Sequence, residues 1–184
     1  SGNTGKFLTT DGSAASWGEA GGSVDFIQRQ TASPASSLDF TTSISDYKSF
    51  ILVCTHFYPT SANANLYIKF NDVTGGYLGL LAGVKYSGQG SVAEQFTNSM
   101  YIAKQLDNDS AKAWKASGKI NIFAESGKRI SCTGTVGYYS NSYGQVAMNV
   151  AGGWDNTAAL TKITVYPSSG NFYGTFTLYG VKTS

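Results

Sequence analysis

Cys54 and His56 are the residues with the clearest potential for covalent chemistry. They lie two positions apart in an almost continuous apolar stretch, residues 49–57 (SFILVCTHF), so in a β-strand their side chains would share one face. A Cys–His pair can act as nucleophile and base, but no oxyanion-binding loop and no third member of such a site is visible. His56 is the single histidine of the chain, and we expect it to be a hydrogen-bonded structural residue.

Carboxylates offer a second kind of chemistry. Two of them about 5–10 Å apart can hydrolyse a glycoside, and with 11 acidic residues in the chain this class stays open. Most of them fall in predicted turns, where solvated side chains are expected: Asp11, Asp46, Asp72, Asp107, Asp109 and Asp155. The segment 107–109 (DND) resembles the start of a calcium loop, but Lys112 and Gly118 stand where that loop needs Gly and Glu. We therefore expect no enzymatic activity, no catalytic residue, no metal and no cofactor.

Aromatic residues in predicted loops are the best candidates for a binding site. Residues 138–143 (YYSNSY) join two predicted strands, and Trp154 follows the next strand. Rigid rings next to short amides can stack on sugars and hydrogen-bond to their hydroxyls. The alternative is that the rings cover the ends of the fold or lie in a subunit contact. The candidate ligand-binding residues are Tyr138, Tyr139, Asn141, Tyr143 and Trp154.

The elements that must position these residues are short β-strands. Residues alternate between apolar and polar through several runs, and turn residues separate nearly all of them. With no amphipathic helix between the strands, this pattern predicts an all-β fold, an antiparallel β-sandwich of the jelly-roll type. The predicted core consists of Ile120, Ile122, Val146, Met148, Ile163, Val165, Phe176 and Leu178.

The first 35 residues differ from the rest. Gly, Ser, Ala and Thr dominate them, and large apolar residues are too sparse for an independent core. We interpret residues 1–35 as an extended N-terminal arm or linker, and residues 36–184 as the sandwich domain. The apolar residues Phe7, Leu8 and Trp17 have no local core, so we expect them to contact other subunits.

Composition excludes several partners. The net charge is +2 and no stripe of Lys or Arg is present, so we expect no binding to nucleic acid. No apolar run approaches the roughly 18 residues needed to cross a bilayer, so we expect no membrane insertion. Cys54 and Cys132 both lie in apolar strand-like runs, which favours two buried free thiols over a disulfide.

Two segments resemble proteins of virus particles. Residues 5–12 (GKFLTTDG), followed by Ser16-Trp17-Gly18, resemble the G-x-x-L-x-T-D-G … x-W segment found repeatedly in phage tail-fibre and other virion proteins. Residues 174–181 (GTFTLYGV) resemble the G-T-x-x-L-Y-G-I strand that ends a β-sandwich domain of phage structural proteins. The resemblance implies a location on the virion surface, assembly as a homotrimer with other virion proteins nearby, and a binding role. It assigns no receptor-binding residue.

The sequence is compatible with three functions, of which two are the main alternatives. The chain is expected to be a tail-fibre or receptor-binding tip that attaches to a host-surface carbohydrate or protein. The alternative is a purely structural knob or capsid decoration protein that binds no ligand. A lectin-like carbohydrate-binding module is the third reading.

Overall fold

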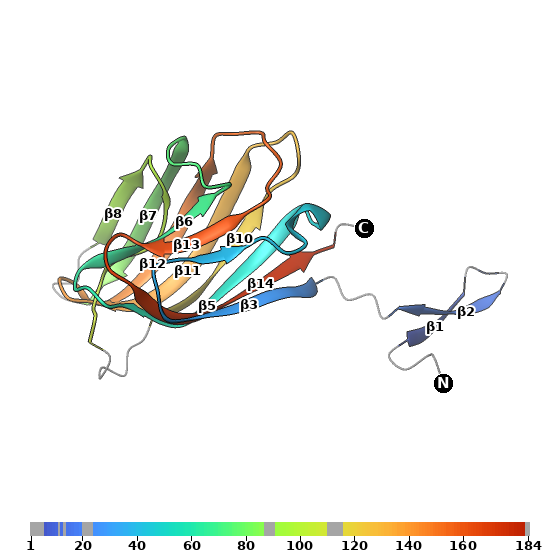
Figure 1. The fold of residues 1–184 in the computed structure, drawn as a ribbon, viewed down its shortest axis with the longest axis horizontal. Coiled ribbons are helices and arrows are strands. Elements are labelled where there is room, and N and C mark those ends of the chain that lie inside the picture. The colour runs from blue at the N-terminus through green and yellow to red at the C-terminus, as the bar shows by residue number, and fades with distance from the viewer. Residues whose placement is uncertain are drawn as a thin grey trace.

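The chain folds into antiparallel β-sheets, as the alternation of its residues predicts (Figure 1). The computed structural model describes residues 6–10, 12, 14–19, 24–86, 91–109 and 116–182. Within them there is no α-helix, and one short 3₁₀ turn, η1 (Ile44–Asp46), lies between two strands. Twelve of the described strands belong to one strongly curved, nearly closed sheet, which packs on itself as two layers. The predicted all-β, jelly-roll-like sandwich is therefore confirmed.

One layer contains eight strands. Their order across the layer is β3, β14, β5, β10, β11, β12, β7 and β8, and every neighbouring pair is antiparallel. In the same order, the bounds are Val24–Ala35, Phe172–Val181, Ser49–Pro59, Ala116–Phe123, Ile130–Ser140, Gly144–Trp154, Tyr77–Lys85 and Ser91–Phe96. The strand that the apolar stretch predicts, β5, lies well inside this layer, between β14 and β10.

The other layer contains four strands, in the order β9, β6, β13 and β4. Their bounds are Met100–Leu106, Ala64–Phe70, Ile163–Pro167 and Leu38–Phe40. The layers are joined where Ser140 of β11 pairs with Leu106 of β9. Figure 1 shows β6 and β13 in front of β10 and β11, so the core lies between these two groups.

The core follows from the period of two along each strand. In β12 the residues alternate regularly between exposed and buried, because successive side chains point to opposite faces. All eight residues predicted to be in the core are buried. Large aromatic residues complete it, among them Phe40, Phe50, Phe57, Phe70, Phe172 and Phe176.

The predicted boundary of the arm at residue 35 is wrong. Residues 24–35 form β3, which pairs with β14 along most of its length. Because β3 is an edge strand with one neighbour in its layer, it needs few large apolar residues, and its sequence resembles that of a linker. The arm is therefore confined to residues before Val24.

Within the arm, β1 (Lys6–Thr10) and β2 (Ala15–Glu19) form a two-stranded sheet of their own, seen beyond the end of β3 in Figure 1. Leu8 pairs with Trp17 in this hairpin. Of the three predicted contact residues, Leu8 is the one whose side chain the structure describes, and it is 63% exposed. Whether these residues contact other subunits stays a prediction.

Cys54 and Cys132 are both free and buried, as predicted. Cys54 of β5 lies in one row with Gly118 and Val136, whereas Cys132 is four residues from Val136 along β11. At about 3.3 Å per residue, this offset is roughly 13 Å, well beyond the ~7 Å that a disulfide can bridge. Burial raises the pKa of both thiols, which disfavours the reactive thiolate form.

Candidate functional site

The turn between β11 and β12 is the loop in which the sequence predicts a binding site. Ser140 is completely buried at the end of β11. Its Oγ accepts hydrogen bonds from the backbone N–H groups of Ser142 and Tyr143, at 3.2 and 3.3 Å. A hydroxyl that replaces backbone partners in this way stabilises a tight turn. The turn is thus held close to the end of β11 by hydrogen bonds.

Tyr138 does not lie on the surface, contrary to the prediction. It is 3% exposed because it follows Val136 and precedes Ser140 on the inward face of β11. Its Oη accepts a hydrogen bond from the backbone N–H of Lys104, at 3.2 Å, and ties β11 to β9. Burial raises the pKa of Tyr138 to about 12. The ring is part of the core.

Trp154 is also buried, and it lies at the opposite end of β12 from the turn. It pairs with Ile130, whereas Gly144 at the other end of the strand pairs with Ser140. Its ring stacks on Tyr77 at a centroid distance of 6.2 Å and packs against Phe70 at 6.3 Å. Trp154 continues the inward face that carries Met148 and Val150, so the alternation extends past the expected end of the strand. It cannot join the other predicted residues in one site.

Three predicted residues remain near the turn. Tyr139 and Tyr143 are half-buried and Asn141 is exposed. With its amide nitrogen turned toward Asp107, Asn141 donates to both carboxylate oxygens, at 3.0 and 3.2 Å. The Nζ of Lys85 lies 5.1 Å from the centroid of the Tyr143 ring. These side chains mainly fix the turn to its neighbours.

Cys54 and His56 do not form a pair, although the spacing predicts that they share a face. His56 has a positive φ of 51° at a point where the β5–β10 register shifts. This irregularity turns the His56 side chain outward, where it is exposed, while Cys54 stays completely buried. The geometry for a Cys–His nucleophile is absent at these two residues.

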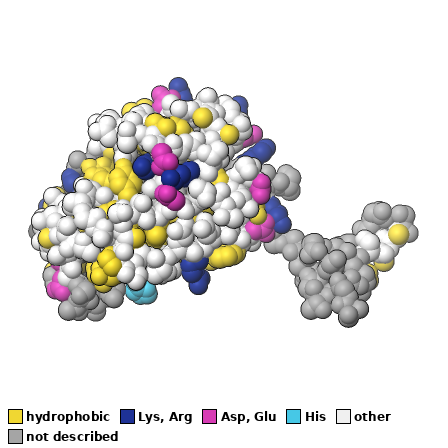
Figure 2. Space-filling view, viewed as in Figure 1, with side chains coloured by type: hydrophobic (Ala, Val, Ile, Leu, Met, Phe, Trp, Pro, Cys, Tyr) yellow, Lys and Arg dark blue, Asp and Glu magenta, His cyan; other side chains and the backbone are white. Residues whose placement is uncertain are grey.

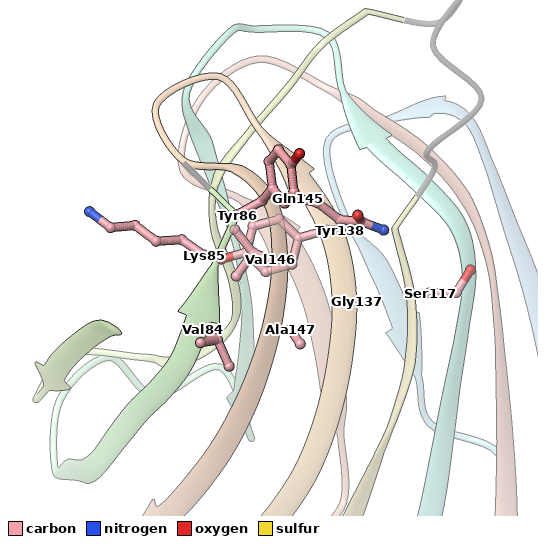
Figure 3. Close-up of a pocket in the computed structure, with 9 residues that line it drawn as sticks. All are labelled: Val84, Lys85, Tyr86, Ser117, Gly137, Tyr138, Gln145, Val146 and Ala147. Atoms are coloured by element: carbon pink, nitrogen blue, oxygen red, sulfur yellow. The ribbon is translucent and has the colours of Figure 1, made fainter. Parts of the chain in front are cut away.

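A pocket of about 540 Å³ opens beside the β11–β12 turn. We call it the sheet-face pocket, because exposed residues of four adjacent strands form its floor on the outer face of the eight-stranded layer. They lie in one transverse row, in the order Ser117, Gly137, Ala147 and Val84. The remaining lining residues are Lys85, Tyr86, Tyr138, Gln145 and Val146 (Figure 3). The volume is within the range of roughly 300–1,000 Å³ that is typical of ligand pockets.

The polar end of the sheet-face pocket is formed by Tyr86 and Gln145. The backbone N–H of Tyr86 donates to the carbonyl oxygen of Gln145 at 2.9 Å, which extends the pairing of β7 and β12. Tyr86 is 80% exposed. Figure 3 shows Tyr86 and Gln145 at one end of the pocket and Val84 and Ala147 toward the other. A phenol and an amide beside an apolar floor suit a ligand with both hydroxyls and apolar faces.

Sequence reasoning missed Tyr86 and Gln145. Gln145 alternates outward with Ala147, and this signal is readable in the sequence. The pairing of β7 with β12 joins residues 61 to 77 positions apart and is not readable from either strand alone.

Within the described ranges, no three His, Cys, Asp or Glu side chains are grouped closely enough to hold a metal ion. No described helix has the length and apolarity needed to cross a bilayer. No protein-family model matches the chain, and a search of curated proteins finds no matching relative.

Proposed function

We propose that this chain is a non-catalytic surface module of a virus particle, a tail-fibre tip that attaches to a carbohydrate or protein on the host surface. The observation that carries the binding role is the sheet-face pocket, with exposed Tyr86 and Gln145 at one end. Rigid rings and amides that a β-sandwich holds in place are an economical way to bind an external ligand. The virion location is supported by the resemblance of residues 5–18 and 174–181 to phage proteins.

A non-catalytic role is supported by the separation of the candidate catalytic groups. Cys54 is enclosed in the core with a raised pKa, and His56 points to the other side of the sheet. The phenol, amide and hydroxyl of the pocket can hydrogen-bond to a ligand, but none of them is paired with a base in the described structure.

Assembly with further copies of the chain is supported by an exposed apolar stripe. Leu78 and Leu80 lie on the outward face of β7, away from the sheet-face pocket, and are 63% and 45% exposed. Exposed apolar groups that line up in this way favour association. The homotrimer that the resemblance implies is retained as part of the proposal.

The structural-knob function is the second candidate, and the burial of Tyr138 and Trp154 favours it. Both rings were candidates for ligand contact, and both instead fill the core. If the remaining aromatic residues have a similar role, the domain has no ligand of its own.

An attachment experiment separates these two functions. The full chain, carrying a fluorophore, is mixed with a panel of bacterial strains, and bound fluorescence is measured by flow cytometry. We expect attachment to at least one strain, and at least a tenfold loss in the variant Tyr86→Ala, Gln145→Ala. The control Thr133→Ala changes an exposed residue of β11 outside the pocket and should attach normally. Attachment to none of the strains, or equal attachment of the double variant, would favour the structural knob.

A further inference from the structure

Three tyrosines form a row across the outer face of the four-stranded layer. Tyr166 of β13 pairs with Tyr67 of β6, and Tyr67 pairs with Tyr101 of β9. The ring centroids of Tyr67 and Tyr166 are 5.4 Å apart, and those of Tyr67 and Tyr101 are 4.7 Å apart in an edge-to-face arrangement. All three rings are half-buried. We call this set the tyrosine row.

The rings are held in place before any ligand arrives. The amide nitrogen of Asn65 donates to Tyr67 Oη at 3.0 Å. The Tyr166 hydroxyl is hydrogen-bonded to Ser99 Oγ, and Lys69 Nζ lies 5.3 Å from the centroid of the Tyr166 ring. Fixed rings lose little conformational freedom on binding, so their contact with a ligand is not offset by ordering.

A pocket of about 260 Å³ lies at the β9 end of the tyrosine row. It is formed by Tyr67 and Tyr101 together with the segment from the end of β8 to the start of β9, residues 95–99 (QFTNS). This segment supplies side-chain amides from Gln95 and Asn98 and a hydroxyl from Thr97. The site therefore combines aromatic faces with groups that both donate and accept hydrogen bonds.

The charges beside the tyrosine row compensate one another. Lys162 Nζ lies 2.8 Å from Asp39 and 2.9 Å from Asp72, and Lys69 Nζ lies 3.4 Å from Asp72. Figure 2 shows basic and acidic side chains clustered next to hydrophobic ones on the face that presents β6 and β13. These two cations and two anions carry no net charge that would attract an anionic ligand. They therefore do not form a basic groove for single-stranded nucleic acid.

From this arrangement we infer that the tyrosine row binds a neutral oligosaccharide, with one sugar ring in the pocket at residues 95–99 and the next rings along Tyr67 and Tyr166. Sugar rings have apolar C–H faces that pack on aromatic rings and hydroxyls that match amides. The site is on the opposite layer from the sheet-face pocket and does not depend on it.

The test uses the full chain and four neutral probes: the hexasaccharides of α1,4-glucose, β1,4-glucose, β1,4-mannose and β1,4-N-acetylglucosamine. Binding is measured by isothermal calorimetry and by saturation-transfer NMR. At least one probe should bind with a dissociation constant that 1 M NaCl changes less than about threefold, because few unpaired charges take part. Failure of all four probes to bind the native chain overturns the inference.

Variants locate the site. Tyr101→Ala should weaken binding at least tenfold, whereas Tyr101→Phe, which keeps the ring, should stay within about threefold of the native chain. Asn98→Ala tests the pocket without disturbing the fold, since the backbone carbonyl of Asn98, which accepts from Gly75 N, is unchanged. It should also weaken binding, and it carries the test alone if Tyr101→Ala fails to fold. Native affinity in Asn98→Ala overturns the inference.

The variant Ala147→Leu, which fills the sheet-face pocket on the other layer, should bind the probe normally. A loss of binding in this variant would assign the saccharide to the sheet-face pocket instead.

Discussion

Phe96 of β8 lies directly opposite Gly79 of β7, and its ring occupies the place that a Cβ at residue 79 would take. Phe96 is 3% exposed, so the ring closes the core where the eight-stranded layer reaches its edge. An aromatic ring packed over a cross-strand glycine compensates for the missing side chain. The pair therefore acts as one packing unit.

The first prediction concerns this pair. Gly79→Ala should destabilise the protein by about 1–3 kcal/mol, because the added methyl group must displace the Phe96 ring. Urea denaturation followed by tyrosine and tryptophan fluorescence measures the loss. The double variant Gly79→Ala, Phe96→Leu should lose less free energy of unfolding than the sum of the losses in the two single variants. Strict additivity would show that the ring and the glycine are independent.

Gly137 gives the opposite case. A Cβ at this position meets no atom of the described chain within 4 Å, because it would point into the sheet-face pocket. Gly137→Val should therefore fold with native or slightly higher stability, since valine favours a strand, and it should attach poorly to the strains that the native chain binds.

A matched pair of substitutions on β12 separates filling of the pocket from a general effect on the sheet. Ala147→Leu fills the pocket, whereas Ala151→Leu adds the same group four residues away on the same exposed face, outside it. Attachment should be lost in the first and kept in the second, with both thermal midpoints near the native value. Equal attachment of the two variants would remove the pocket from the binding site.

The stability of the start of β3, around Asp25, should depend on pH. Tyr47 Oη donates to Asp25 Oδ2 at 2.8 Å, and Lys182 Nζ lies 3.1 Å from the same oxygen. The Tyr47 hydroxyl and then Lys182 lower the pKa of Asp25 from its ordinary value of 3.8, and the bond to Asp25 raises the pKa of Tyr47 from 10.0. Because the carboxyl pKa is lowered, Asp25 stabilises the fold at pH values above its ordinary pKa. This stabilisation is lost as the pH falls through the folded-state pKa. Because the phenol pKa is raised, Tyr47 stabilises the fold at pH values below 10.0. This stabilisation is lost as the pH rises above 10.0 and through the folded-state pKa.

Hydrogen exchange of backbone amides should show this pH dependence. Amides of β3 near Asp25 and of β14 near Val181 should be better protected in the native chain than in Asp25→Asn at about pH 7, and the difference should shrink as the pH falls below 3.8. The variant Asp155→Asn removes a carboxylate that pairs with Arg129, away from Asp25 and Tyr47, and should leave these amides unchanged. A difference between native and Asp25→Asn that is constant with pH would exclude the proposed linkage.

The arm should be dispensable for folding. Deleting residues 1–23 removes β1 and β2 but leaves β3 paired with β14, so the thermal midpoint should change little. If Phe7, Leu8 and Trp17 contact other subunits, light scattering should show weaker association of the shortened chain at micromolar concentration. A deletion to residue 35 also removes an edge strand and should lower the midpoint markedly. Native association of the shortened chain would place the contact elsewhere, with Leu78 and Leu80 as the next residues to change.

Much of the fold was predictable from the sequence because the direction of a side chain in a strand is a local property. Alternation placed Ile120, Ile122, Val146 and Met148 in the core correctly. The same rule, applied further along β11 and β12, also accounts for the burial of Tyr138 and Trp154. The expected exposure of Tyr138 and Trp154 was wrong, because each follows the alternation of its own strand and not the character of the turn residues beside it.

The sequence by itself thus determined an all-β chain with alternating strands, buried cysteines and an apolar core. Only the tertiary structure decided that residues 24–35 join the sheet, that His56 turns outward at a shift in register, and that Tyr67, Tyr101 and Tyr166 form one row. Each of these depends on which strands pair and in which register. Pairing joins residues far apart in the chain through backbone groups that every residue carries, and the packing of the whole core selects among the possible registers.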